Sequence, residues 1–263
     1  MEEPGTLYFT GTAGAGKSNM TRAFHGWLKA AGYDSIIVNL DPGAERLDYE
    51  PDVDIREWVR LADVMADYGL GPNGAQVAAA DMIALKIFDV KEAVAELKTD
   101  YVLIDTPGQV ELFAFREASK AIVDALSGSR SLIAFLFDPA LARNASGFAS
   151  LLLLSATVEF RFRLPMLNLL SKVDVLTDVQ RAELLGWGED PDRLYDSITQ
   201  DLPTPEVQLS GELVRALGTL SPLSTLLPTS AKDGEGLEHL YQSAQRVFGG
   251  GEDLEPSQGP APE

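Results

Sequence analysis

Apolar residues along the chain gather in short, nearly continuous runs, and most of the stretches between them carry apolar residues at helical spacing. The runs cover residues 7–10, 35–40, 101–104, 131–137, 166–170 and 225–227. Such runs are typical of strands buried on both faces, and their alternation with helices is typical of a parallel sheet. The pattern predicts an α/β fold with three layers, in which helices flank a mostly parallel sheet.

About sixty residues separate the second and third predicted strands, more than a simple crossover needs. Two sets of apolar positions within this stretch have helical spacing. They are Ile55, Trp58, Val59, Ala62 and Met65, and then Ile83, Ile87, Val90, Val94 and Leu97. The turn-forming residues Gly71-Pro72-Asn73-Gly74 separate the two sets. We expect a helical insertion at about 44–98 that carries this turn.

Composition limits the domain organisation. With 263 residues and 45% hydrophobic content, the chain is long enough for one large domain that carries an insertion. We expect a domain over 1–248. The remaining residues, 249–263, are rich in Gly, Pro and Glu and have few apolar side chains, which predicts a flexible tail.

Cysteine is absent from the chain, which excludes disulfides, thiolate zinc sites and cysteine nucleophiles. This is compatible with a reducing cytoplasm, the location that we expect. The first residues lack the basic and apolar segments of a secretion signal. No run of about eighteen apolar residues follows, so neither secretion nor a membrane span is indicated.

The formal net charge is −19 and the sequence pI is about 4.4. Such a charge repels a phosphate backbone, so nucleic acid is not expected as a direct partner. Two explanations of the acidity remain open. It is either an adaptation to a saline cytoplasm, where ions screen self-repulsion, or the property of an ordinary acidic protein.

The most specific motif is the segment from Gly11 to Ser18, which fits the phosphate-loop pattern G-x-x-x-x-G-K-[ST]. It lies between the first predicted strand and an amphipathic stretch that runs to Leu28, as a P-loop NTPase fold requires. Lys17 would reach the β and γ phosphates, and the Ser18 hydroxyl would hold Mg²⁺. The expected nucleotide-binding residues here are Gly14, Ala15, Gly16, Lys17, Ser18 and Asn19.

Polar residues that follow the second and third strands supply candidates for magnesium binding and hydrolysis. Asp105 would hold Mg²⁺ through water, and the Gly108 N–H would donate to the γ phosphate. Gln109 follows Gly108 directly and is a candidate to orient the attacking water. Asp41, directly after the second strand, is a candidate partner of Mg²⁺ waters or of the nucleophile. Glu111 is a second carboxylate in the same loop as Gln109, and we rank it below Gln109.

The ends of the fifth and sixth strands carry candidates for base recognition. Ser171-Lys-Val-Asp174 differs by one residue from the N-K-x-D pattern that recognises guanine. The Asp174 carboxylate would accept two N–H bonds from guanine, which adenine cannot offer. The alkyl stem of Lys172 would cover the base or ribose. After the sixth strand come Ser230 and Ala231, whose N–H would donate to the guanine O6. Ser171 replaces the Asn of this pattern with a smaller hydroxyl side chain, so its contact to the base is the least certain of the set.

The phosphate loop and the polar segments after the third, fifth and sixth predicted strands occur in the order found in GTPases. Together they resemble a GTPase. The Gly-Pro-Asn sequence at 71–73, between the segments 39–43 and 105–113, narrows the resemblance to the GPN-loop GTPases, over roughly residues 5 to 248. Members of that family vary between Ser and Asn at the position of Ser171. The resemblance implies binding of GTP and GDP with Mg²⁺ as cofactors.

The resemblance also implies a homodimer, in which the loop of one subunit reaches the nucleotide of the other. Asn73 would lie near the γ phosphate or the attacking water, with Pro72 fixing the backbone. Whether Asn73 or Gln109 positions the water remains open. Eukaryotic relatives point to a protein partner, the assembly machinery of multisubunit RNA polymerase.

Three functions remain in competition. The first is a GTP-hydrolysing, homodimeric switch that assists assembly or transport of a protein complex. The second is a small-molecule kinase, which would need an acceptor pocket and usually an arginine-rich lid that the sequence does not show. The third is a nucleotide-regulated binding module without significant hydrolysis. Such a module would be expected to lack Lys17, Asp105 or Gln109, and all three are present.

Overall fold

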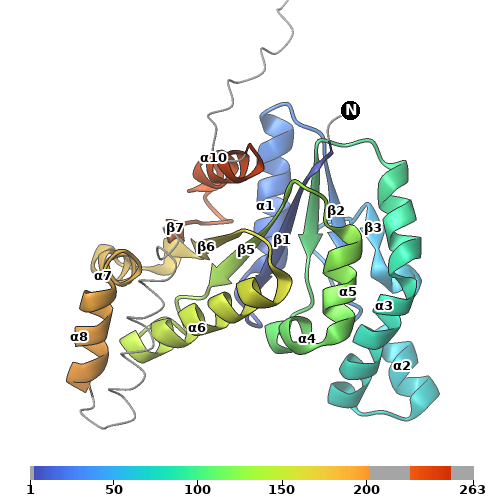
Figure 1. Ribbon diagram of the computed structural model, residues 1–263, viewed down its shortest axis with the longest axis horizontal. Coiled ribbons are helices and arrows are strands. Elements are labelled where there is room, and N and C mark those ends of the chain that lie inside the picture. Colours follow the sequence, from blue (N-terminus) through green and yellow to red (C-terminus); the bar gives the residue numbers. More distant parts are fainter. Residues whose placement is uncertain (1–2, 202–225, 250–263) are drawn as a thin grey trace, which may run out of the picture.

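A computed structural model describes residues 3–201 and 226–249 of the chain. Its centre is a seven-stranded sheet in which every strand pair is parallel, in the order β3-β2-β4-β1-β5-β6-β7 (Figure 1). The strands are β1 (Gly5–Gly11), β2 (Ser35–Asn39), β3 (Val53–Asp54), β4 (Tyr101–Asp105), β5 (Ser131–Phe137), β6 (Met166–Leu170) and β7 (Leu227–Pro228). The predicted three-layer α/β fold is confirmed.

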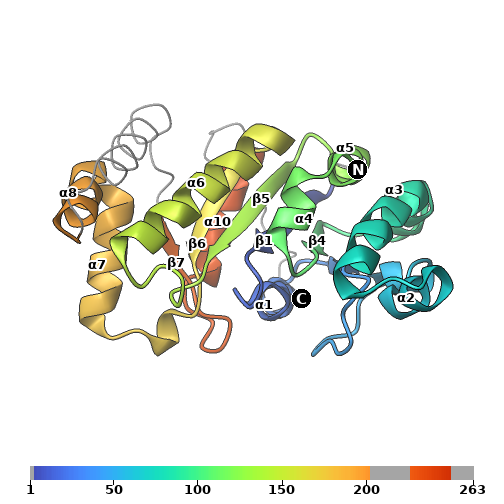
Figure 2. The same ribbon diagram turned by 90° about the horizontal axis from the view of Figure 1, so that it is seen from below.

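Helices cover both faces of the sheet (Figure 2). They are α1 (Lys17–Ala30), α2 (Leu61–Tyr68), α3 (Pro72–Glu96), α4 (Val110–Phe115), α5 (Glu117–Leu126), α6 (Ala145–Phe162), α7 (Asp178–Glu189), α8 (Pro191–Asp201) and α10 (Leu237–Phe248). Two short 3₁₀ helices, η1 (Ile55–Glu57) and η2 (Val173–Val175), complete the described elements.

Side chains of β1 alternate between two hydrophobic cores, as the pleat of a strand requires. Leu7 and Phe9 pack under α1 and α10, while Tyr8 faces the core beneath α3, α5 and α6. Both faces of β1 are therefore covered, which agrees with its central run of apolar residues, Leu7, Tyr8 and Phe9. Because every strand pair is parallel, the carboxyl ends of the strands meet at one edge of the sheet, where polar residues can gather around a ligand.

The insertion between β2 and β4 contains the two expected helices, α2 and α3, together with a strand that the apolar pattern did not predict. β3 is only two residues long and extends the sheet beside β2. The five apolar positions expected on one helical face do not lie on a single helix. Ile55 opens η1, and α2 begins only at Leu61. A salt bridge between Arg56 and Asp54 holds the bend between strand and 3₁₀ helix at an N···O distance of 2.5 Å.

The residues Gly71-Pro72-Asn73-Gly74 do not form a separate turn. Gly71 caps the N-terminus of α3, and Pro72 occupies the first helical position. Proline suits this position, since its fixed φ matches the helix and its missing N–H would have no partner there. The Gly-Pro-Asn sequence is therefore the start of a 25-residue helix.

Residue 225 of the sixth predicted strand lies outside the described residues, as does the predicted tail beyond Gly249. Within the described part of the chain, α6 is long and apolar enough, by length and composition, to cross a membrane. It is 44% buried in the structure and packs against β5, α4 and α8. This packing is that of a core helix.

Candidate active site

The phosphate-loop segment connects β1 to α1 at the carboxyl edge of the sheet. Gly14 and Gly16 have φ values of 78° and 96°, in the left-handed region that glycine adopts without strain. Gly16 is also the N-cap of α1, so the loop winds directly in front of the positive end of that helix. Loop and helix together form the kind of anion-binding cradle that the motif predicts.

Lys17 is buried beneath this loop, with 6% of its surface exposed. Its Nζ donates to the carbonyls of Gly11 and Thr12, each at 3.0 Å, and to the carbonyl of Gly108 at 2.9 Å. The side chain therefore ties the phosphate loop to the segment after β4. Phosphate oxygens are stronger acceptors for an ammonium group than carbonyls are, so the same Nζ is suited to exchange these partners for a nucleotide.

Asp105 ends β4 as a buried carboxyl group, only 2% exposed. Its Oδ2 accepts a hydrogen bond of 2.6 Å from the Tyr49 hydroxyl, while Oδ1 has no hydrogen-bond partner. Burial raises the pKa of Asp105, against the opposing effects of the Ser18 and Tyr49 hydroxyls and of the Lys17 charge.

This site fits the Mg²⁺ that the sequence predicts. A buried carboxylate oxygen without a partner is costly unless a ligand satisfies it, and Ser18 lies nearby to supply a hydroxyl. The described residues contain no group of three or more His, Cys, Asp or Glu side chains that could hold a metal ion. Beside nucleotide phosphates, Mg²⁺ usually takes only one or two ligands from the protein, and one carboxylate with one hydroxyl meets this need.

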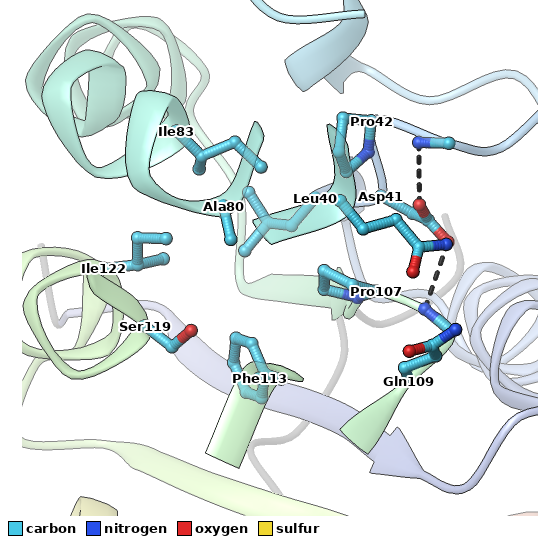
Figure 3. A pocket seen from close by; sticks show the side chains of 13 residues that line it. Leu40, Asp41, Pro42, Ala80, Ile83, Pro107, Gln109, Phe113, Ser119 and Ile122 are labelled. Carbon is cyan, nitrogen blue, oxygen red and sulfur yellow. Dashed lines mark hydrogen bonds between the residues drawn. The ribbon is translucent and has the colours of Figure 1, made fainter. Parts of the chain in front are cut away.

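Asp41 joins the two loops that follow β2 and β4. Its Oδ1 accepts from the Gly43 N–H at 2.8 Å and its Oδ2 from the Gly108 N–H at 3.1 Å (Figure 3). The Asn39 side chain in turn accepts from the Asp41 N–H at 3.0 Å. The Gly108 N–H, a predicted donor to the γ phosphate, thus bonds a carboxylate of the same chain.

A cavity of about 110 Å³ opens beside Asp41 and Gly108 (Figure 3). Gln109, the N-cap of α4, lines it, as does Gln76 of α3. Apolar side chains from the residue after β2 and from α3, α4 and α5 also line it: Leu40, Ile83, Phe113 and Ile122. Of the predicted catalytic residues, Asp41 and Gln109 thus lie together.

The two remaining catalytic candidates are placed differently. Asn73 lies exposed in the first turn of α3 and does not line this cavity. The backbone of Glu111 belongs to α4, but its side chain lies outside what the structure describes. Asn19, in the first turn of α1, follows the phosphate loop directly.

The two predicted base-recognition segments lie side by side. The Asp174 Oδ1 accepts from the Ser230 hydroxyl at 3.0 Å, and the Lys232 ammonium lies 4.0 Å from its Oδ2. Ala231 follows with a partly exposed surface. The Ser171 hydroxyl donates to the Phe137 carbonyl at 3.0 Å, so it ties the end of β6 to that of β5.

Lys172 links this region to the phosphate loop. Its backbone has a φ of 54°, and its Nζ donates to the Gly14 carbonyl at 2.5 Å and to Asp138 at 3.1 Å. Asp138, at the end of β5, and Tyr49 were not predicted as site residues. Asp138 has a signal that a search of every strand end would find, since it directly follows an apolar run. Tyr49 has none.

A phosphate loop between the central strand and the first helix of a parallel, helix-covered sheet defines the chain as a P-loop NTPase. A family described as a conserved hypothetical ATP-binding protein matches residues 9–250. A GPN-loop GTPase from Pyrococcus abyssi is 32% identical over 244 residues, which cover 92% of this chain and 96% of the relative. GPN-loop GTPase 3 of Kluyveromyces lactis is 29% identical over 253 residues, covering 94% and 93%.

The crystal structure of a GTPase in apo form from Pyrococcus abyssi has the same fold. Its TM-score is 0.84 at 30% identity, and the match covers 93% of this chain and 97% of that one. The chain belongs to the GPN-loop GTPase family. It is a GTPase that binds guanine nucleotide.

Proposed function

We propose that this GTPase is a Mg²⁺-dependent, homodimeric molecular switch that assists assembly or transport of a protein complex. The observation that carries the proposal is the link between the phosphate loop and the loops after β2 and β4. Lys17 bonds the Gly108 carbonyl, and the Gly108 N–H bonds Asp41. One residue, Gly108, thus joins all three segments that would surround a γ phosphate.

GTP binding would exchange these internal partners. Lys17 turns from the backbone carbonyls to the phosphates, and the Gly108 N–H turns from Asp41 to the γ phosphate. The released Asp41 carboxylate, with Gln109 close by, is then available to accept from the attacking water. Mg²⁺, when bound beside Ser18 and Asp105, supplies positive charge to the phosphate oxygens. Hydrolysis removes the γ phosphate and restores the internal bonds, which makes the exchange a switch.

The homodimer belongs to the same proposal. Asn73 is exposed at the start of α3 and is free to meet a second copy of the chain. In the dimer it would reach the nucleotide of the other subunit, where it or Gln109 would orient the water. A client such as RNA polymerase assembly machinery and a cytoplasmic location are proposed from the family resemblance.

A nucleotide-regulated binding module is the second candidate. The observation that favours it is the apolar cavity beside Asp41, which could receive a partner's side chain when the loops move. The two candidates differ in turnover, because a binding module retains bound GTP unhydrolysed.

Phosphate release from GTP and ATP, measured in parallel with Mg²⁺, tests the proposal. We expect GTP to be preferred and both Lys17→Ala and Asn73→Ala to be impaired. Lys17→Ala should lose nucleotide binding, whereas Asn73→Ala should bind normally and turn over at least about tenfold more slowly. Equal use of ATP would contradict the guanine site, and full activity of Asn73→Ala would contradict the contribution of the second subunit.

Light scattering of the purified protein, with GDP and with a nonhydrolysable GTP analogue, gives the oligomeric state. A monomer in both states would contradict the homodimer.

A further inference from the structure

The Tyr49 side chain reaches the metal-binding region from a distant part of the sequence. Tyr49 lies in the loop between β2 and β3, and its hydroxyl donates to the Oδ2 of Asp105, 56 residues away, at 2.6 Å. The Ser18 hydroxyl also lies close enough to the Asp105 carboxyl group to lower its pKa, but the bond from Tyr49 is the one that holds Oδ2. A short bond to a buried carboxyl group strongly limits the directions in which that group can point.

The bond makes the two oxygens of Asp105 different. Oδ2 is held by the tyrosine, while Oδ1 is buried and has no partner. Without the hydroxyl, the carboxyl group could rotate and share either oxygen with its neighbours. With it, Oδ1 remains the oxygen that is open to a ligand. A ligand that offers positive charge would satisfy that atom.

The loop that carries Tyr49 is fixed at both ends, so the hydroxyl does not depend on a freely moving segment. At its start, Asp41 bonds the N–H of Gly108. At its end, Asp52 exchanges two hydrogen bonds with the backbone of Ile37 in β2, at 2.8 and 2.9 Å. Tyr49 lies three residues before Asp52. The sheet edge therefore sets the position of the hydroxyl beside β4.

We propose that Tyr49 is a positioning residue for the divalent cation. Its hydroxyl holds the Asp105 carboxyl group so that Oδ1 faces the Mg²⁺ that accompanies the nucleotide. This inference rests on the proposed Mg²⁺-dependent function. It assigns Tyr49 an effect on cation affinity that is separate from nucleotide affinity, because the hydroxyl donates its hydrogen bond to the carboxyl group of Asp105. Residues that orient a metal ligand in this way change metal affinity by about 10–100-fold.

The test is Tyr49→Phe, which keeps the ring and removes the hydroxyl. Release of a fluorescent GDP derivative is measured over a series of free Mg²⁺ concentrations and in EDTA. We expect the variant to need about tenfold more Mg²⁺ for half-maximal retention, with a release rate in EDTA within about twofold of wild type. Tyr33→Phe is the matched control. Tyr33 also has a 2.6 Å bond, accepted from the Tyr241 hydroxyl, but precedes β2 at the opposite end of that strand.

Three results would overturn the inference. An unchanged Mg²⁺ requirement in Tyr49→Phe would show that the hydroxyl does not position the carboxyl group. A lower requirement would show that the tyrosine competes with the cation. An equally large change in EDTA would show a role in folding or nucleotide binding alone.

Combining Tyr49→Phe with Asp105→Asn tests whether the tyrosine acts through Asp105. Tyr49→Phe should have no added effect on the Mg²⁺ requirement once Asp105 is replaced, since it acts through that residue. An additive effect would contradict the inference. If the wild-type protein released nucleotide at the same rate with and without Mg²⁺, the proposed function would fail together with it. If only the variant failed to differ, the proposed function would stand.

Discussion

Two neighbours contact the Asp174 carboxylate in the predicted base site: the Ser230 hydroxyl at one oxygen and the Lys232 ammonium, 4.0 Å away, at the other. The Ser230 hydroxyl bonds one carboxylate oxygen, and the side chain is largely buried between the ends of β6 and β7. A carboxylate held in this way can accept two N–H bonds from guanine. The fixed geometry, rather than charge alone, is what would distinguish guanine from adenine.

Asp174→Asn should shift the base preference from guanine toward xanthine. The amide nitrogen can donate to the additional carbonyl of xanthine and can no longer accept both guanine N–H groups. We expect GDP affinity to fall at least about tenfold, with a gain for XDP. Competition between the two nucleotides for a fluorescent GDP derivative measures this change. An unaltered preference would remove Asp174 from the base site.

Asp138 holds Lys172, the residue that connects the predicted base site to the phosphate loop. Asp138 is 7% exposed, and its carboxylate lies 3.1 Å from Nζ. Asp138→Asn removes the charge and should leave the lysine less well placed over the base, so GDP affinity should fall about three- to tenfold. Glu235→Gln is the control variant, because it also removes a carboxylate from an ion pair, the exposed one with Arg181. Equal affinities for both variants and wild type would contradict this role of Asp138.

The site residues that the sequence predicts lie within short motifs, and those that it misses do not. Gly11 to Ser18 is one contiguous segment whose spacing alone defines the loop. Tyr49 meets Asp105 only because the chain between β2 and β3 returns along the sheet edge. No local pattern records such a contact, because tertiary packing across 56 residues produces it.

At the scale of elements, continuous apolar runs predict strands well when the strands are long. β1 and β5, with seven residues each, are clear in the sequence. β3 has two residues, too few to show a period, and the bend after it depends on the pair of Asp54 and Arg56. Gly71 to Gly74 illustrate a different limit. Proline and glycine favour turns, yet proline equally suits the first residue of a helix.

The loops after β2 and β4 should move as one element, because Asp41 connects them. Asp41→Ala removes the acceptor of the Gly43 and Gly108 N–H groups. We expect faster amide hydrogen exchange in the peptide that contains residues 105–109 when nucleotide is absent. With a nonhydrolysable GTP analogue the difference should disappear, since the γ phosphate would replace the carboxylate as acceptor. Unchanged exchange without nucleotide would show that the two loops are not coupled through Asp41.

At the scale of the whole molecule, the excess of acidic side chains makes charge repulsion a cost to the folded state. The chain carries 40 acidic and 21 basic side chains, so many carboxylates have no basic partner available. Exposed pairs such as Arg116 with Asp81, and Arg161 with Glu117, contribute only about 0–1 kcal/mol each. Salt weakens such pairs, but it also weakens the repulsion among the unpaired carboxylates.

We expect the repulsion to dominate, so the midpoint of thermal unfolding should rise by several degrees between about 0.1 M and molar KCl. The screening length falls from about 10 Å to about 3 Å over this range, which weakens the repulsion among exposed carboxylates. Circular dichroism at 222 nm measures the midpoint, with GDP absent so that nucleotide binding does not contribute. A series with sucrose in place of KCl separates screening from general exclusion of solute. Equal stability at both salt concentrations would contradict the adaptation to a saline cytoplasm and leave an ordinary acidic surface.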